Sequence, residues 1–321
     1  MAGQKAEDFQ TYYVPDQSSM AILSSVCLAL IVLGVAGGIN SLSTDASGAG
    51  SWFLFAAGLV MFIGVLSVWF GIAIKENLQG MNSEQLKRSY RIGMQWFIFS
   101  EVMFFASFFG ALFYFRSISG PELASETNSI LWNGFNYDWP LMITPQDAVG
   151  GVDAQAKLGH LANNGEFSGP KENLSFPGFA DMLGWLPFWN TVVLLSSSVT
   201  CEIAHHALKA GNKRKFNIGL GATLVLAIIF VILQIQEYAH AYGDLGMTLE
   251  TGAYGSIFFM ITGFHGFHVC MGAVMLAVQW IRSVGKGHFT AEDHFGFEAS
   301  AWYWHFVDVV WIFVMVVVYL Y

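Results

Sequence analysis

Long apolar stretches alternate with polar segments along the chain. A helix needs about 20 mostly apolar residues to cross the hydrocarbon core of a bilayer. Seven stretches reach that length, at 21–40, 51–74, 92–115, 182–204, 217–239, 253–281 and 299–321. Because backbone polar groups cannot stay unpaired in lipid, each stretch is expected to cross as a continuous helix. The pattern therefore predicts an all-α membrane protein with seven transmembrane helices.

Composition supports a membrane location. Hydrophobic residues make up 55% of the chain and charged residues only 12%, whereas a soluble domain carries about 25% charged residues. With only 14 Lys and Arg residues and no basic tract, the chain lacks the electrostatic footprint of a nucleic-acid-binding protein. We therefore expect partners in the membrane and no nucleic-acid partner.

The positive charges are divided unequally between the two sets of connections. Eleven lie in the N-terminal segment or after the second, fourth and sixth stretches, namely Lys5, Lys75, Lys87, Arg88, Arg91, Lys209, Lys213, Arg214, Lys215, Arg282 and Lys286. Three lie on the other side: Arg116, Lys157 and Lys171. Because cytoplasmic connections carry the excess of Lys and Arg, the N-terminus is expected inside and the C-terminus outside.

The predicted organisation follows from these stretches. A cytoplasmic N-terminal segment (1–20) comes before a pair of helices (21–74), and an inner loop (75–91) leads to the third helix (92–115). A long outer-side loop (116–181) then connects to the last four helices (182–321). The long loop is rich in Gly, Asn, Pro, Asp and Glu. A structureless loop of that length is uncommon in a compact protein, so it packs as a cap, carries short helices or contacts a partner.

Glu101 is the sharpest chemical feature of the apolar stretches. It lies about 15 Å along the third stretch, near mid-membrane, and no basic residue shares that stretch. Ionisable groups in lipid are costly and often mark functional sites. Two interpretations stay open: a proton-linked or lipid-linked carboxyl, or a neutral acid that is hydrogen-bonded to a neighbouring helix or another subunit.

Histidines in the last two stretches are further candidates. His265 and His268 are three residues apart, so they lie on one face of a helix, which would suit a metal or a haem edge. A metal site needs three or four ligands, however, and no carboxylate or cysteine accompanies them at ligand spacing. His305 and Asp308 are also three residues apart, and such a buried pair is either structural or part of a proton path.

Five polar residues lie near the ends of the fourth and fifth stretches: Glu202, His205, His206, Glu237 and His240. Such side chains can reach the membrane interface, and we interpret them as interface anchors. The residues alone also allow an independent proton-linked transporter that uses Glu101, or a haem-binding electron carrier that uses the histidines.

Several motifs resemble those of cytochrome c oxidase subunit III. Its C-terminal signature is similar to two segments here, TGFHGFHV and HFGFEASAWYWHFVDVVW. Its third helix resembles FSEVMFFASFFGALFYF, and its fourth resembles LPFWNTVVLLSSSVTCEIAHHALKAG. The resemblance covers roughly 90–115 and 182–321, with weaker agreement over the first two helices.

The resemblance implies a fold and a function. Helices 1–2 are expected to stand apart from a bundle of helices 3–7, across a cleft that holds lipid. The chain is expected to be a non-redox accessory subunit of a proton-pumping aa3-type cytochrome c oxidase, which passes electrons from cytochrome c to O2. It would stabilise subunit I, support proton uptake and bind phospholipid. The family implies no cofactor in this chain beyond structural phospholipids, since haem a and copper belong to subunits I and II.

Residue by residue, the resemblance places the buried carboxyl of the family at Glu101. It implies structural or proton-environment roles for His265, His268, Glu298, His305 and Asp308. Contacts with lipid headgroups are expected at the inner edge, from Arg282 and His288. The resemblance implies no catalytic residue and no metal ligand.

Two departures from the family bear on the source membrane. The loop 116–181 is longer than in mitochondrial members, and the segment YYVPDQS before the first helix resembles bacterial members. A bacterial plasma membrane is therefore favoured over the mitochondrial inner membrane. A quinol oxidase subunit III stays an alternative, although that subunit usually has five spans.

Overall fold

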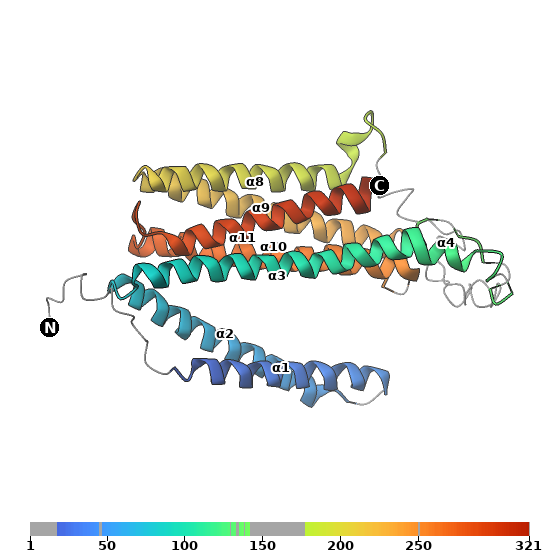
Figure 1. The fold of residues 1–321 in the computed structure, drawn as a ribbon, viewed down its shortest axis with the longest axis horizontal. Coiled ribbons are helices and arrows are strands. Elements are labelled where there is room, and N and C mark those ends of the chain that lie inside the picture. Colours follow the sequence, from blue (N-terminus) through green and yellow to red (C-terminus); the bar gives the residue numbers. More distant parts are fainter. Residues whose placement is uncertain are drawn as a thin grey trace. The chain divides into compact units, whose positions relative to one another are not determined.

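The structure, a computed structural model, describes residues 18–44, 47–128, 130–132, 135–137, 139–141, 177–249 and 251–320. Every regular element in these ranges is a helix (Figure 1). The chain divides into two compact units, Met1–Gly93 and Met94–Tyr321. Most of the expected segments 1–20 and 116–181, with Lys5, Lys157 and Lys171, lies outside the described residues.

In the first unit, α1 (Met20–Ser43) and α2 (Ala49–Leu78) pack against each other. Glycines let the two backbones approach closely. A Cβ on Gly34 would overlap the backbone of Phe55, and one on Gly58 would lie 3.0 Å from the amide nitrogen of Ile31. Small residues have this role between transmembrane helices, because lipid supplies no hydrophobic force that brings helices together.

The third helix begins earlier than the sequence pattern predicted. We expected a loop at 75–91, but α2 continues to Leu78 and α3 covers Glu84–Tyr114. The Ser83 hydroxyl accepts a hydrogen bond from the amide of Leu86 at 3.2 Å, as an N-cap does. The boundary was wrong because an apolar window marks only the lipid-embedded part of a helix, which charged residues of good helix propensity can extend.

The second unit contains the rest of α3 and four long helices: α8 (Leu186–Lys209), α9 (Lys213–Gly243), α10 (Gly252–Lys286) and α11 (Phe295–Val314). Short elements extend them: η2 (Phe115–Ser119) and α4 (Gly120–Leu123) follow α3, η4 (Met182–Gly184) precedes α8, and η5 (Met315–Leu320) follows α11. α8 packs on α9, α9 on α10, α10 on α11 and α11 on α8, which closes a four-helix bundle (Figure 1).

Local signals set the ends of these helices. Gly211, at a φ of 74°, allows the sharp turn between α8 and α9. Asn212 then caps α9, because its side chain accepts a hydrogen bond from the amide of Lys215 at 3.0 Å. Gly287 ends α10 in the left-handed conformation that glycine adopts without strain.

Large aromatic side chains fill the bundle. Trp304 and Trp311 of α11, Phe230 of α9 and Phe258 of α10 are almost completely buried. Gly272 of α10 makes room for one of them, since a Cβ there would lie 2.9 Å from the Trp304 ring. This aromatic core holds α8–α11 together and positions the polar side chains between them.

Within the described ranges, six helices are long and apolar enough to cross a membrane: α1, α2, α3, α9, α10 and α11. α8 is not among them, although its 24 residues would reach about 36 Å. Buried polar residues such as Asn190 and Ser197 lower its hydropathy. All seven expected helices are therefore present, while the seventh crossing and the lipid-holding cleft stay predictions.

Gly34→Leu should destabilise the α1–α2 pair by about 1–3 kcal/mol, because the larger side chain would overlap the backbone of Phe55. The matched control is Gly64→Leu in α2, where an added Cβ meets nothing within 4 Å. The thermal unfolding midpoint of the purified protein in detergent measures the difference. Equal midpoints for the two variants would contradict the close approach at Gly34.

Candidate functional site

Glu101 of α3 and His268 of α10 form a polar pair between two helices. Glu101 Oε2 lies 2.8 Å from His268 Nε2. The other ring nitrogen of His268, Nδ1, lies 2.6 Å from the carbonyl oxygen of Phe264. The Glu101 and His268 side chains are 23% and 7% exposed, so the pair is largely enclosed by the second unit. The carboxyl singled out in the sequence thus has a partner that the sequence did not reveal.

One exchangeable proton lies between the two groups of this pair. A carbonyl oxygen can only accept, so Nδ1 of His268 carries a proton and donates it to Phe264. Nε2 then either accepts a hydrogen bond from a protonated Glu101 or donates one to the Glu101 carboxylate. These two forms differ only in the position of one proton. The shared proton can therefore move from one group to the other without breaking the contact between α3 and α10.

Aromatic rings surround the Glu101–His268 pair. Phe105 of α3 meets the His268 ring edge-on, with centroids 4.9 Å apart, and Tyr303 of α11 stacks on it at 6.3 Å. Such walls limit the access of water. Hydrogen bonds between polar groups are electrostatically stronger in this setting than in water, and an unpaired group is correspondingly more costly.

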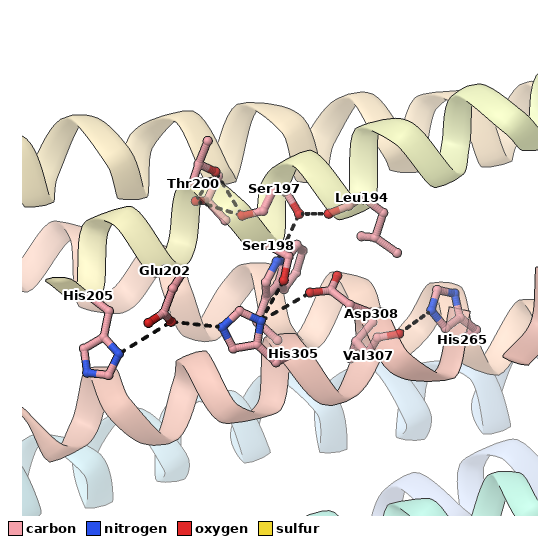
Figure 2. Close-up of polar contacts among 12 residues, drawn as sticks. Leu194, Ser197, Ser198, Thr200, Glu202, His205, His265, His305, Val307 and Asp308 are labelled. Atoms are coloured by element: carbon pink, nitrogen blue, oxygen red, sulfur yellow. Dashed lines mark hydrogen bonds and ion pairs between the residues drawn. The ribbon is translucent and has the colours of Figure 1, made fainter. Parts of the chain in front are cut away.

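A second polar cluster joins α8 to α11 (Figure 2). His305 Nδ1 lies 2.7 Å from Ser198 Oγ and 3.5 Å from Asp308 Oδ2. The other nitrogen of His305, Nε2, faces Glu202 Oε2 at 3.7 Å. The Glu202 side chain is 49% exposed and that of Asp308 is 5% exposed. The cluster thus leads from a half-exposed carboxyl to a buried one through a single imidazole.

Glu202 is also close to two histidines of its own helix. His206 Nε2 lies 3.1 Å from Glu202 Oε1, and His205 Nδ1 lies 3.8 Å from Glu202 Oε2. The exposed His206 fits our interpretation as an interface anchor. His205 does not, because it is buried and its ring packs against His294 at 5.7 Å.

His265 and His268 make separate contacts despite their shared spacing on α10. His265 Nε2 lies 3.1 Å from the carbonyl oxygen of Val307, and its ring packs on Trp311 at 4.9 Å. His265 therefore contacts α11, whereas His268 reaches α3. Across the described ranges, no group of three or more His, Cys, Asp or Glu side chains is arranged to hold a metal ion.

Glu237 is a buried carboxyl that the sequence analysis misjudged. We interpreted it as an interface anchor, but it is 1% exposed. Tyr319 of η5 donates a hydrogen bond to Glu237 Oε1, and Asn190 Nδ2 of α8 donates one to Oε2 at 3.3 Å. Its position near a helix end suggested exposure, yet η5 and α8 cover it. These partners lie 82 and 47 residues away along the chain, so no local pattern indicated them.

The two residues expected to meet lipid headgroups lie at the C-terminal end of α10. The Arg282 guanidinium sits over the Phe289 ring at 4.7 Å and donates from Nη1 to Gln279 Oε1 at 2.8 Å. Partial burial lowers the pKa of His288, and the positive charges of Arg282 and Lys286 add to this effect. Both side chains remain partly exposed, so either can meet a ligand at this surface.

Comparison with known proteins decides the family. The family model described as Cytochrome c oxidase subunit III matches residues 10–134 and 182–321. The chain belongs to the cytochrome c oxidase subunit III family. Cytochrome c oxidase subunit 3 of Dugong dugon is 36% identical over 280 residues, which cover 85% of this chain and 88% of the relative. The Cyprinus carpio protein of the same description is 34% identical over 315 residues, or 98% of both chains.

Membership in the subunit III family makes the chain a subunit of the cytochrome c oxidase complex and a multi-pass protein of a respiratory membrane. The family carries no redox centre of its own. Residues 135–181, which make up most of the loop expected at 116–181, lie outside the family match.

The site residues of this subunit III chain lie in several places instead of one. The Glu101–His268 pair joins α3 to α10, while His305 joins α11 to α8. Glu298 is half-buried in the first turn of α11. The last two helices thus include residues whose side chains connect one helix to the next.

Tyr319→Phe should lower the free energy of unfolding by about 1–3 kcal/mol, because it removes a hydrogen-bond donor from the buried Glu237 carboxyl. Tyr242→Phe is the matched control, since that side chain lies near the same end of α9 and is exposed. Thermal unfolding of the purified complex compares the two. If Tyr319→Phe unfolds no earlier than the control, the Glu237 contact contributes nothing measurable.

Proposed function

We propose that this chain is the non-redox accessory subunit III of a proton-pumping aa3-type oxidase that passes electrons from cytochrome c to O2. Its direct partners would be subunits I and II, which would contain haem a and copper. It would stabilise subunit I, support proton uptake and bind phospholipid. The observation that carries the proton role is the Glu101–His268 pair, in which one proton can move between two enclosed groups.

Phospholipid binding is supported by the surface around Glu101. Val102 and Met103, next to it in α3, are 44% and 54% exposed, and Phe97 is 47% exposed. An apolar helix surface of this kind is expected to face lipid chains, and the Glu101 side chain is partly open beside it. At the end of α10, the partly exposed Arg282 would contact lipid headgroups, together with His288.

The proposed orientation places the N-terminus inside and the C-terminus outside, with α8 as the seventh crossing. Four Lys and Arg residues lie at or next to the turn between α8 and α9. The end of α10 is at the same end of the bundle, because Lys213 Nζ donates to the carbonyl oxygen of Gly287 at 3.4 Å. Positive charge gathered at one end indicates the cytoplasmic side. We also propose that the α1–α2 pair stands apart from the other helices across a lipid-holding cleft.

A bacterial plasma membrane is the proposed location, with the mitochondrial inner membrane as the alternative. The support is the YYVPDQS segment before α1, which resembles bacterial members, and the loop at 116–181, which is longer than in mitochondrial members. Much of that loop has no counterpart in the matched family ranges.

Glu101→Gln tests the proton role of the pair. Glutamine keeps the size of the side chain and can still donate to His268, but it cannot exchange a proton. We expect the oxidase to assemble normally and to inactivate after fewer turnovers. Initial turnover should fall by much less than about 100-fold, the least that an obligatory proton-transfer group contributes, because the redox chemistry belongs to other subunits.

Glu122→Gln is the matched control, because Glu122 lies on the exposed surface of α4. The measurements are the haem content of the purified complex, its initial turnover, its proton pumping and its activity during continuous turnover. If Glu101→Gln matches both wild type and the control in inactivation and in proton pumping, Glu101 is a packing residue and the proposed proton role is wrong.

A further inference from the structure

The cluster between α8 and α11 contains an imidazole with a different carboxyl group facing each of its nitrogens (Figure 2). His305 Nδ1 faces Asp308 Oδ2 at 3.5 Å, and Nε2 faces Glu202 Oε2 at 3.7 Å. A structural histidine needs only one such partner. Two carboxyl groups on opposite sides of one ring suit a histidine that accepts a proton at one nitrogen and releases it from the other.

The cluster is open at one end and closed at the other. His206 is 74% exposed, Glu202 is 49% exposed, His305 is 35% exposed and Asp308 is 5% exposed, all as side chains. Ser198 and His206 are eight residues apart on α8, which is about 12 Å along the helix axis. Polar side chains therefore extend from the Lys209 end of α8 into the bundle, and along the series from His206 to Asp308 each is less exposed than the one before it.

We propose that Glu202, His305 and Asp308 form a proton relay. It carries protons between the end of the bundle where Lys209 lies and the buried carboxyl of Asp308. This proposal deepens the proposed function, because it rests on the role of subunit III in proton uptake for its physiological use. The relay is distinct from the Glu101–His268 pair, which lies between α3 and α10.

The relay moves one proton in two transfers. A proton on the Glu202 carboxyl passes to Nε2 of neutral His305, and the Nδ1 proton of His305 passes toward the Asp308 carboxylate. The ring stays neutral, with its proton now on Nε2, and the reverse sequence unloads Asp308. Ser198 Oγ, 2.7 Å from Nδ1, can accept the ring proton and donate its own, since a hydroxyl does both at once.

Both carboxyl groups of the relay lie farther from His305 than a hydrogen bond reaches. The 3.5 Å between His305 Nδ1 and Asp308 Oδ2 exceeds hydrogen-bond length, so the Asp308 side chain must move closer before transfer. The 3.7 Å between His305 Nε2 and Glu202 Oε2 exceeds hydrogen-bond length, so a rotation of the Glu202 side chain must precede transfer. The half-exposed Glu202 side chain has room for that rotation. On its other side Glu202 is 3.1 Å from His206, which lets an exposed imidazole supply the proton.

The surrounding groups come from every helix that packs on the relay. Charged or titratable neighbours at its open end are His205, His206 and Lys209 of α8, with His294 and Glu298 at the start of α11. α9 faces this part of α8 with Thr223 and Gly219, which do not titrate. α10 contributes His265, which contacts the Val307 carbonyl next to Asp308.

The test is hydrogen–deuterium exchange of the Asp308 carboxyl, followed by infrared difference spectroscopy on the purified oxidase complex. Asp308→Asn identifies the carboxylic-acid band by removing it. We expect exchange of that band to slow by about 100-fold in His305→Gln, the lower range for loss of a positioned proton-transfer group. Glu202→Gln should slow it too, because it removes the group that delivers the proton.

The matched controls are His240→Gln and Ser196→Ala, which should exchange at the wild-type rate. His240 is an exposed histidine near the opposite end of the bundle, and Ser196 is an exposed serine of α8 that bonds the Val192 carbonyl of its own helix. If no Asp308 band is found in wild type at any pH at which the complex is stable, the relay is overturned. Wild-type exchange in His305→Gln also overturns it.

A second variant and two functional measurements complete the test. If His305→Gln fails to assemble, Glu202→Gln decides alone, because its half-exposed site tolerates the change, and wild-type exchange there overturns the relay. Turnover and pumping of the same complexes separate the two proposals. Slowed exchange with unchanged turnover and pumping supports the relay but contradicts its use in proton uptake.

Discussion

A carboxyl group among apolar helices must find its partners inside the protein, because hydrocarbon offers none. Two acids of the second unit find hydrogen-bond partners on other helices, and a third faces a histidine at the longer distance of 3.5 Å. Glu101 pairs with a histidine of another helix, Asp308 faces a histidine one turn away on its own helix, and Glu237 accepts hydrogen bonds from a tyrosine and an asparagine. The Glu101 and Glu237 contacts join different helices, and His305, beside Asp308, reaches Ser198 of α8.

These contacts select one arrangement of helices from many that an apolar core would allow. Aromatic rings such as Trp304 and Trp311 fill the core, but their contacts do little to fix how one helix is positioned against another. A buried polar pair is different, because removing one partner leaves the other unpaired at a cost of about 3–5 kcal/mol when it is charged. The pairs therefore discriminate against helices that slip or rotate, even where their net contribution to stability is small.

The same pairs give the chain chemistry that a redox-free subunit can use. A carboxyl beside an imidazole can hold a proton on either group, and nearby aromatic rings keep bulk water from competing. Glu101 and His268 form an enclosed pair of this type, whereas the cluster of His305 opens gradually toward the basic end of the bundle. One chain thus combines two kinds of carboxyl–imidazole contact, one enclosed and one that opens toward the surface.

Sequence patterns predicted the helices well but the contacts poorly. The lengths of the apolar stretches alone predicted all seven long helices. The position of Glu101 near the middle of the third stretch marked it as a buried carboxyl. The start of α3 was missed because hydropathy does not register the charged first turns of a helix. The partner of Glu101 could not be foreseen, since His268 lies 167 residues away. Glu237 was assigned to the interface for the same reason: only the folded chain brings Tyr319 to it.

The most direct test of the central claim is a mild-detergent purification of the tagged chain from its native membrane, with a reduced-minus-oxidised spectrum of the product. We expect haem-containing subunits I and II to co-purify, and stronger detergent should then leave this chain colourless. Recovery of a stable, colourless chain that never associates with an oxidase core would contradict it. A haem spectrum that stays with the isolated chain would contradict it equally.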